Sequence, residues 1–344
     1  ELARRIGRTP KMVNEIIAGK APITPETALL LEQVLGVPAR LWNNLERRYQ
    51  EDLARISERE TLKDHVSWLK ELPLREMIRA NWIPEHDDEI EQLRAVLSFF
   101  GVATPVEWRA VWLRPQAAFR QSAAFEADPT AVAAWLRKGE LDAQRIPCAP
   151  YEKSKFRNAL HEIRALTTVP PAVFQRQMVD LCAGAGVALV FVPAISRTRA
   201  SGVTCWLTPE KALIQLSLRY KADDQLWFTF FHEAGHIYLH GKRDIFIEGE
   251  ETEASEKETE ADRFAADMLI PRKVWSQFRS QPRQHYSKDE IYAFARSIGI
   301  APGIVAGRLQ HEDEDVPYSY FNDLKRRLDW RVEDGTALVV EKGR

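Results

Sequence analysis

Cysteine is scarce in this chain, which has only three in 344 residues: Cys148, Cys182 and Cys205. They are widely spaced and form no Cys-x-x-Cys pair, which excludes a disulfide framework and a thiolate zinc site and is typical of the reducing cytoplasm. Long apolar runs are also missing: the run at 226–231 is interrupted by Thr229, and the run at 187–192 has only six residues. We therefore expect no membrane span and no membrane partner. No signal peptide is visible, so we predict a cytoplasmic protein.

An excess of charge of either sign is also absent. The chain has 48 Lys and Arg against 50 Asp and Glu, a formal net charge of −2. This excludes a uniformly basic nucleic-acid-binding protein but permits a local basic patch. The 45% of hydrophobic residues is ordinary for a globular protein and too high for a disordered one. At about 100–200 residues per domain, the length predicts two or three domains.

Secondary-structure signals change along the chain. Thr-Pro pairs at 9–10 and 24–25 predict helix starts, with Thr as the N-cap and Pro in the first turn. Residues 51–165 are predicted to be mostly helical. Three β-branched and aromatic runs predict strands, at 187–192, 203–207 and 213–218. Helical periodicity then returns from Asp224, with further helices predicted over 257–270 and 287–310. The fold class is therefore mostly α, with one α+β domain that contains a small sheet.

A metal-binding pattern lies at 232–236, which reads His-Glu-Ala-Gly-His. Residues i and i+4 share one face of a helix, so His232 and His236 can reach the same ion. Glu233 lies beside them, where it can deprotonate a water on that ion. This is the HExxH signature of zinc peptidases. We therefore predict a Zn²⁺ site with Glu233 as the catalytic base.

The next helix offers a third ligand. Glu258 and Asp262 are four residues apart and share a face, so Glu258 can bind zinc while Asp262 orients a histidine ring. Glu260 points elsewhere on that helix, but it stays an alternative ligand because the helical phase cannot be read from the sequence. His240 continues the face of His236. Because zinc peptidases leave the fourth position to water, we expect His240 to support the ligands rather than to bind.

These two motifs resemble the ImmA/IrrE family of metallopeptidases. The resemblance lies in His-Glu-Ala-Gly-His-Ile-Tyr-Leu-His at 232–240 and Glu-Thr-Glu-Ala-Asp-Arg-Phe-Ala-Ala-Asp-Met-Leu-Ile-Pro at 258–271. It implies a gluzincin-like (zincin) core over about 170–310, with the family's zinc histidines at His232 and His236, its catalytic glutamate at Glu233 and its distal ligand within 258–262. Characterised members cleave transcriptional repressors, often after a stress signal. The oxyanion also needs a donor, for which His311, Arg308 and Tyr318 are candidates.

The first residues have the spacing of a helix-turn-helix. Ala3 is small where two helices would cross, Gly7 lies in the turn, and Val13 and Ile16 are expected to face the core. Four polar residues are then placed to contact DNA: Lys11 and Asn14 at base edges, and Arg8 and Lys20 at phosphates. Residues 1–50 contain eight Lys and Arg against five acids, a local charge of +3 that agrees with DNA binding.

The segments at 19–28, 35–38 and 41–45 resemble Xre-type repressors, most closely the HigA branch of antitoxins. That resemblance implies operator DNA, a homodimer and a toxin as partners. The first helix that is usual in such domains would precede Glu1, so we expect weak DNA binding from the chain that begins there.

Together these patterns predict four regions: a helix-turn-helix domain (1–52), a helical connecting region (53–165), a zinc metallopeptidase domain (166–313) and a C-terminal extension (314–344). The predicted function is that of a DNA-binding regulator and zinc metalloendopeptidase that cleaves a repressor, an antitoxin or itself. The alternative is an antitoxin-like repressor whose peptidase-like domain is a sensor or a partner-binding module. The intact pair of histidines with Glu233 favours the peptidase, because an inert fold has no chemical need for Glu233.

Overall fold

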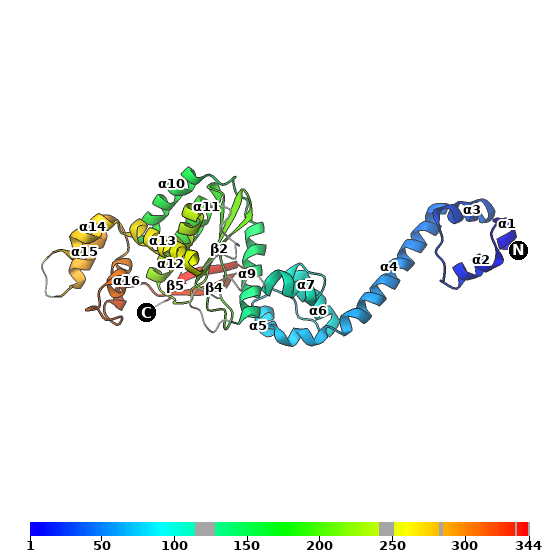
Figure 1. Cartoon of the computed structure of the whole chain (residues 1–344), viewed down its shortest axis with the longest axis horizontal. Coiled ribbons are helices and arrows are strands. Elements are labelled where there is room, and N and C mark those ends of the chain that lie inside the picture. The colour runs from blue at the N-terminus through cyan, green and yellow to red at the C-terminus, as the bar shows by residue number, and fades with distance from the viewer. Residues whose placement is uncertain (114–127, 241–250, 282–284, 334–335, 343–344) are drawn as a thin grey trace. The chain divides into compact units, whose positions relative to one another are not determined.

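The structure is a computed structural model that describes residues 1–113, 128–240, 251–281, 285–333 and 336–342, with the side chains of 251–255 and 336 excepted. Its contacts divide the chain into two compact units. The first contains Glu1–Leu69 and His86–Arg94, and the second contains Lys70–Glu85 and Ala95–Arg344. The mostly helical fold with small sheets agrees with the prediction (Figure 1).

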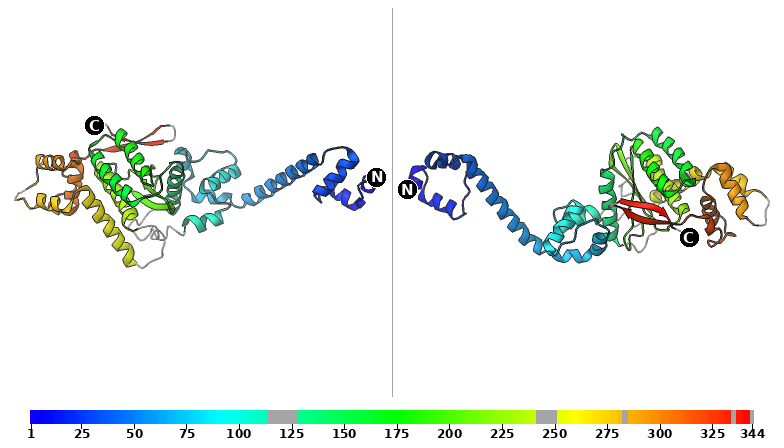
Figure 2. Two further views of the ribbon diagram at one scale, coloured as in Figure 1. Left: turned by 90° about the horizontal axis from the view of Figure 1, so that it is seen from above. Right: turned by 180° about the vertical axis from the view of Figure 1, so that it is seen from behind.

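The first unit begins with three short helices, which are followed by one long helix (Figure 2). They are α1 (Leu2–Arg5), α2 (Pro10–Ile17), α3 (Pro25–Leu35) and α4 (Ala39–Lys63). The predicted starts are confirmed, because the hydroxyls of Thr9 and Thr24 accept backbone N–H groups and cap α2 and α3. Gly36 ends α3 in the left-handed conformation. The small core of this unit is formed by Ala3, Ile6, Val13 and Leu31, with partly buried neighbours.

Helices predominate up to the sheet. In chain order they are η1 (Val66–Glu71), α5 (Leu74–Arg79), α6 (Glu89–Phe100), α7 (Pro105–Trp108), the π-helical η2 (Arg109–Leu113), α9 (Pro129–Gln144), α10 (Lys153–Ala165), η3 (Leu166–Thr168) and α11 (Pro171–Gly184). Several tryptophans are buried here, among them Trp108 and Trp135. The indole N–H of Trp135 donates to the backbone oxygen of Val192, which ties α9 to the sheet.

Three strands form the sheet of the second unit, in the order β1–β3–β2. They are β1 (Val187–Phe191), β2 (Gly202–Thr208) and β3 (Lys211–Leu216). Strand β1 is parallel to β3, whereas β2 is antiparallel to it. All five residues of β1 are buried, which explains its uninterrupted apolar sequence. The three predicted strands are confirmed within about two residues at each end.

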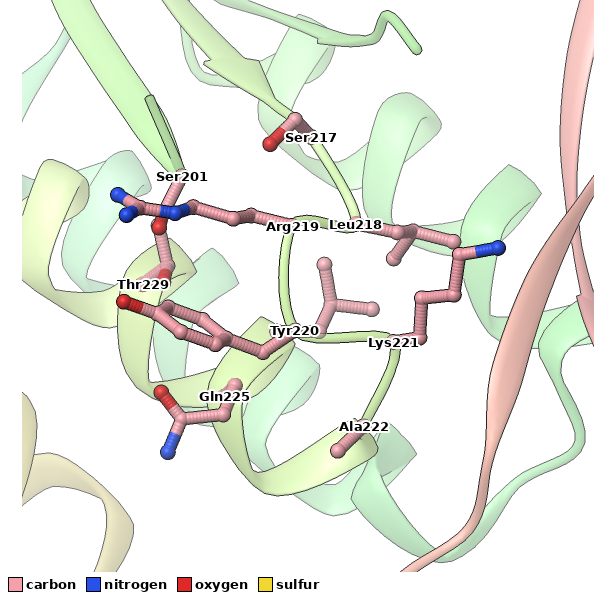
Figure 3. A pocket seen from close by; sticks show the side chains of 10 residues that line it. Ser201, Ser217, Leu218, Arg219, Tyr220, Lys221, Ala222, Gln225 and Thr229 are labelled. Atoms are coloured by element: carbon pink, nitrogen blue, oxygen red, sulfur yellow. The ribbon is translucent and has the colours of Figure 1, made fainter. Parts of the chain in front are cut away.

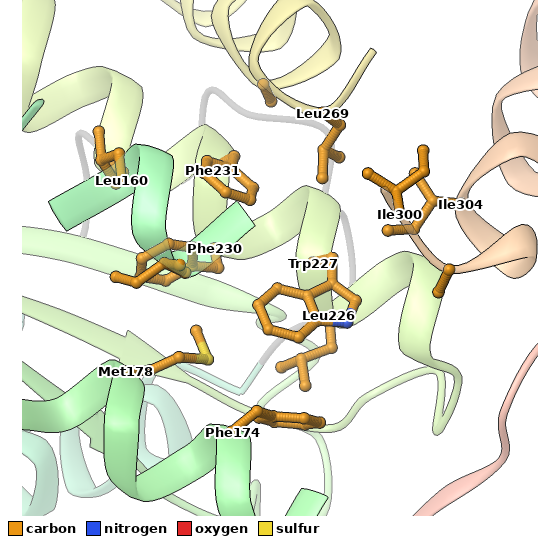
Figure 4. Packing of buried hydrophobic residues seen from close by; sticks show 14 of the residues in the cluster. Leu160, Phe174, Met178, Leu226, Trp227, Phe230, Phe231, Leu269, Ile300 and Ile304 are labelled. Atoms are coloured by element: carbon orange, nitrogen blue, oxygen red, sulfur yellow. The ribbon is translucent and has the colours of Figure 1, made fainter. Parts of the chain in front are cut away.

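The sheet has helices on both faces. Ala188, Val190 and Leu213 pack on one side against a cluster that includes Trp135 of α9. The other face belongs to the main core, where α11 and α12 (Asp223–Gly235) contribute several of the large apolar side chains shown in Figure 4. Trp227, Phe230 and Phe231 of α12 are fully buried in this core. Helix α12 is therefore fixed along its length by packing against the sheet and α11.

The C-terminal part completes the same unit. After the π-helical η4 (His236–His240) come α13 (Glu251–Leu269), α14 (Arg272–Arg279), α15 (Lys288–Ile298), α16 (Pro302–Glu312), η5 (Asn322–Leu324), β4 (Leu328–Glu333) and β5 (Thr336–Glu341). Strands β4 and β5 form an antiparallel pair. Gln175 of α11 donates to the backbone oxygen of Ala337 and accepts from the N–H of Val339. No described helix is both long and apolar enough to cross a bilayer.

A buried ion pair joins the start of α12 to the segment before β4. The Arg326 guanidinium lies 3.1 Å from Asp223, whose other carboxylate oxygen accepts the backbone N–H of Arg326 at 3.0 Å. The same guanidinium also donates to the backbone oxygens of Thr167 and Val169, which follow α10. Burial raises the pKa of Asp223 to about 6, although Arg326 opposes the shift. The pair therefore connects three separate segments at the base of α12.

We predict that Arg326→Met lowers the free energy of unfolding of the second unit by about 3–5 kcal/mol, because it leaves the Asp223 carboxylate buried without its cation. Urea unfolding followed by tryptophan fluorescence measures the loss. Arg331→Met is the matched control, since Arg331 pairs with Glu333 on the exposed face of β4. It should change stability by no more than about 1 kcal/mol. Equal losses in the two variants would contradict the assigned role of Arg326.

Candidate metal centre

The candidate centre lies between α12, its continuation η4, and α13. The apolar face of α12 turns Trp227, Phe230 and Phe231 into the core. This orientation leaves His232 and His236, one turn apart, on the side that faces α13. Helix α13 packs along α12 and brings Glu258 to both histidines. The packing of the core therefore determines which side chains meet at the centre.

The three side chains converge on one point. The Nε2 atoms of His232 and His236 are 3.1 Å apart. Glu258 places one carboxylate oxygen 3.1 Å from Nε2 of His232 and the other 3.5 Å from Nε2 of His236. These ligand atoms form a group that could hold a metal ion. In a tetrahedral zinc site with bonds of about 2.0–2.1 Å, neighbouring ligand atoms are about 3.3–3.4 Å apart. The donor set therefore fits zinc in type and in spacing.

The outer nitrogens of both histidines have their own partners. Nδ1 of His232 lies 2.8 Å from a carboxylate oxygen of Asp262. Nδ1 of His236 lies 3.1 Å from Nδ1 of His240. With a proton on each Nδ1, both Nε2 lone pairs point at each other and at the Glu258 carboxylate. These are the tautomers in which both Nε2 atoms, together with Glu258, could bind one metal ion, which supports a metal site.

The structure separates the two glutamates that the sequence left open as ligands. Glu258 belongs to the converging group, whereas Glu260 lies 3.1 Å from Nε2 of His240. Burial lowers the pKa of His240, against the effect of Glu260. Hydrogen bonds with His232 and His236 lower the pKa of Glu258 well below its usual range. Burial alone would lower the pKa of His232, but bonds with Asp262 and Glu258 outweigh it and raise the pKa to about 10.

Glu233 lies next to the converging group and is 8% exposed. Burial raises its pKa to about 7, although the neighbouring His232 and His236 lower it. Gly202, the first residue of β2, allows this close approach. A Cβ at this glycine would be 2.6 Å from a methyl carbon of Thr229 and 2.9 Å from a carboxylate oxygen of Glu233. Any larger residue at 202 would displace Glu233, a constraint that the sequence alone did not reveal.

A small pocket adjoins the same end of β2 (Figure 3). Its floor is Thr229, one helical turn before Glu233, and its wall includes Ser201, the neighbour of Gly202. Figure 3 shows Arg219 and Tyr220 extending to the side on which Thr229 lies. The Arg219 guanidinium lies 5.2 Å from the centre of the Tyr220 ring. Arg219 and Tyr220 thus line a pocket next to Thr229, and the sequence analysis singled out neither residue.

The oxyanion candidates proposed from the sequence have other surroundings. The Arg308 guanidinium donates to the backbone oxygens of Ala266 and Ile270 and pairs with Glu312. It therefore fastens the end of α13 to α16. Tyr318 is 72% exposed, and His311 is exposed as well. Among the described residues, no contact of His311 or Tyr318 with the metal-binding group is found.

The four candidate DNA contacts lie around α2. Arg8, Lys11, Asn14 and Lys20 are all exposed. Val13 packs in the core as expected, whereas Ile16 is half-buried and lies outside the core cluster. Lys11 has a weak ion pair with Glu15, at 3.8 Å. Lys11 and Asn14 thus lie on the exposed surface of α2, which also includes Ile17 at 76% exposure, and Arg8 and Lys20 flank the helix.

Comparison with known families agrees with both domains. Residues 200–310 match the IrrE N-terminal-like domain of the M78 peptidases, and residues 1–42 match a helix-turn-helix family. The chain joins a helix-turn-helix domain to an IrrE/ImmA-like peptidase domain. No curated protein matches the chain. The match over 200–310 contains Gly202 at the start of β2 together with α12 and α13, and therefore every residue of the candidate centre.

We predict one bound zinc per chain, measured by elemental analysis of the purified protein. His232→Ala and Glu258→Ala should each lose the zinc, because a zinc site of this type needs three protein ligands and each variant leaves only two. The matched control is Asp267→Ala, a partly exposed acid further along α13 that pairs with Arg272. Full zinc content in His232→Ala would show that the ion is held elsewhere. Loss in Glu260→Ala with retention in Glu258→Ala would make Glu260 the ligand.

Proposed function

We propose that this protein is a DNA-binding regulator and a zinc-dependent metalloendopeptidase that cleaves a transcriptional repressor or an antitoxin, either in trans or within itself. The coarser part, a regulator with a helix-turn-helix and a peptidase-like domain, follows from the two family matches. Its proposed partners are the protein substrate, operator DNA bound as a homodimer, and a toxin. Its proposed location is the cytoplasm.

The observation that carries the proposal is the position of Glu233. Burying a carboxylate costs free energy, and Glu233 is a buried charged residue that adds nothing to the hydrophobic core. It lies beside two convergent histidines, with a pKa raised to about 7 that suits a group which must take up and release a proton near neutral pH. A sensor that only binds partners has no use for such a group. The arrangement therefore supports hydrolysis over the alternative of an inert, partner-binding fold.

In the proposed reaction, His232, His236 and Glu258 hold the ion, and Asp262 orients His232 through its Nδ1 hydrogen bond. Zinc, when bound, supplies Lewis-acid activation of the attacking water and of the scissile carbonyl. Glu233 takes the proton of the water and delivers it to the leaving amine.

We predict that Glu233→Gln keeps the bound zinc and the fold but lowers cleavage by about 10²–10⁴-fold, because the amide preserves the shape of the carboxylate and removes the base. The measurement is the rate at which a discrete product appears when the protein is incubated with candidate repressors and antitoxins. Glu210→Gln, at an exposed turn between β2 and β3, is the control and should cleave like the wild type.

Two outcomes decide against this mechanism. Undiminished cleavage by Glu233→Gln would remove Glu233 from the reaction. If the zinc-loaded wild type cleaves neither candidate substrates nor itself, the alternative of a repressor with a sensor domain replaces the peptidase. A zinc-dependent product that disappears with a chelator and returns with added zinc would support the proposal.

We predict that the residues around α2 have separable effects on DNA binding. Asn14→Ala should reduce the preference for operator over random DNA, because each good base contact contributes about 1–3 kcal/mol; Lys11 is expected to act in the same way. Lys20→Ala should weaken binding to both DNAs about equally and reduce its salt dependence, as should Arg8→Ala. Titrations of both DNAs at several salt concentrations measure this. Equal losses on both DNAs from Asn14→Ala would mean that α2 does not read bases.

A further inference from the structure

The imidazole of His240 lies between a metal-binding histidine and a carboxylate. Its side chain is 8% exposed, whereas that of Glu260 is 58% exposed. Both ring nitrogens of His240 have a partner: Nδ1 lies 3.1 Å from Nδ1 of His236, and Nε2 lies 3.1 Å from Glu260. A buried imidazole must satisfy both nitrogens, and here each has one partner at hydrogen-bond distance.

Only one arrangement of protons satisfies the whole series when His236 binds an ion. A metal-binding Nε2 must present its lone pair, so the proton of His236 is on Nδ1. That proton is donated to Nδ1 of His240, which must therefore be an acceptor. A neutral His240 then carries its proton on Nε2 and donates it to the Glu260 carboxylate. The negative charge at the outer end holds each ring in this tautomer.

We propose that Glu260 and His240 are positioning residues that hold His236 in its metal-binding tautomer and orientation, as Asp262 does directly for His232. This inference rests on the proposed zinc site. It assigns to Glu260 a role that differs from that of a ligand. Because His240 lies in the π-helical η4 that continues α12, the support for His236 comes from its own helix as well as from α13.

The tautomer of His236 gives a test that needs no metal. The two ring nitrogens of His236 in the metal-free protein are followed by nitrogen NMR, which distinguishes a protonated from an unprotonated ring nitrogen. We expect the proton of His236 on Nδ1 in the wild type and a shift toward Nε2 in His240→Ala. In His240→Asn, the amide oxygen can occupy the place of Nδ1 and accept the same proton, so this variant should restore the wild-type tautomer. An unchanged His236 signal in His240→Ala overturns the proposal.

Zinc affinity, measured by competition with a chelator, tests the role of Glu260. Loss of an outer partner of a metal-binding histidine typically weakens binding 10–100-fold. We expect about a 10-fold loss in Glu260→Ala, whereas Glu256→Ala removes another exposed acid of α13 and should bind like the wild type. The double variant His240→Ala/Glu260→Ala should be no weaker than His240→Ala, because Glu260 acts through that ring.

The outcomes separate this inference from the proposed function. If the two single losses add in the double variant, Glu260 acts only through its charge and the positioning role is wrong. Complete loss of zinc in Glu260→Ala, with full retention in His240→Ala, would make Glu260 a ligand and overturn the inference. If the wild type binds no zinc, the proposed function fails, and the His236 tautomer still decides whether Glu260 and His240 orient that ring. Thermal unfolding of each variant verifies that the fold is intact.

Discussion

The burial of one face of α12 is the constraint on which the rest of the second unit depends. Trp227, Phe230 and Phe231 must all enter the same core, and this fixes the rotation of the helix about its axis. Once that rotation is set, His232 and His236 can only face α13. A loss of this packing would therefore cost more than stability, because it would also change the direction of both imidazoles. The packing of the apolar residues before the motif therefore also holds the two histidines of the candidate metal centre in position.

Rotation alone does not fix the helix along its axis, and here the Asp223–Arg326 pair contributes. Its guanidinium joins the first turn of α12 to the end of α10 and to the segment before β4. A buried ion pair contributes little net stability when compared with an apolar pair of the same shape. Removal of only one partner is strongly destabilising, because the other charge is left buried and unpaired. The arrangement therefore favours one position of α12, and it makes the C-terminal hairpin a support for the helix that carries the centre.

The sequence predicted those features whose signals are local. The strands, the capped helices α2 and α3, and the i and i+4 spacing of His232 and His236 all depend on neighbours within a few residues. Features that depend on distant partners were missed: Arg326 is 103 residues from Asp223, and the approach of Gly202 to Glu233 joins β2 to α12. The β4–β5 pair did leave a signal, the Asp334-Gly335 dipeptide between alternating residues, which is typical of hairpins. The sequence also did not show that the guanidinium of Arg308, one of the oxyanion candidates, donates to the backbone oxygens of Ala266 and Ile270.

The acids of α13 explain why spacing alone left the third ligand open. Glu258 and Glu260 are two residues apart and therefore project in nearly opposite directions from the helix. Yet both reach an imidazole, because the histidines extend over two turns of α12 and η4. In the proposed arrangement, Glu258, Asp262 and Glu260 have three different tasks: Glu258 binds the ion, Asp262 orients His232, and Glu260 orients His236 through His240. A helix rich in acids at this position reflects the number of imidazoles that need a partner, and only one of its carboxylates has to bind the ion.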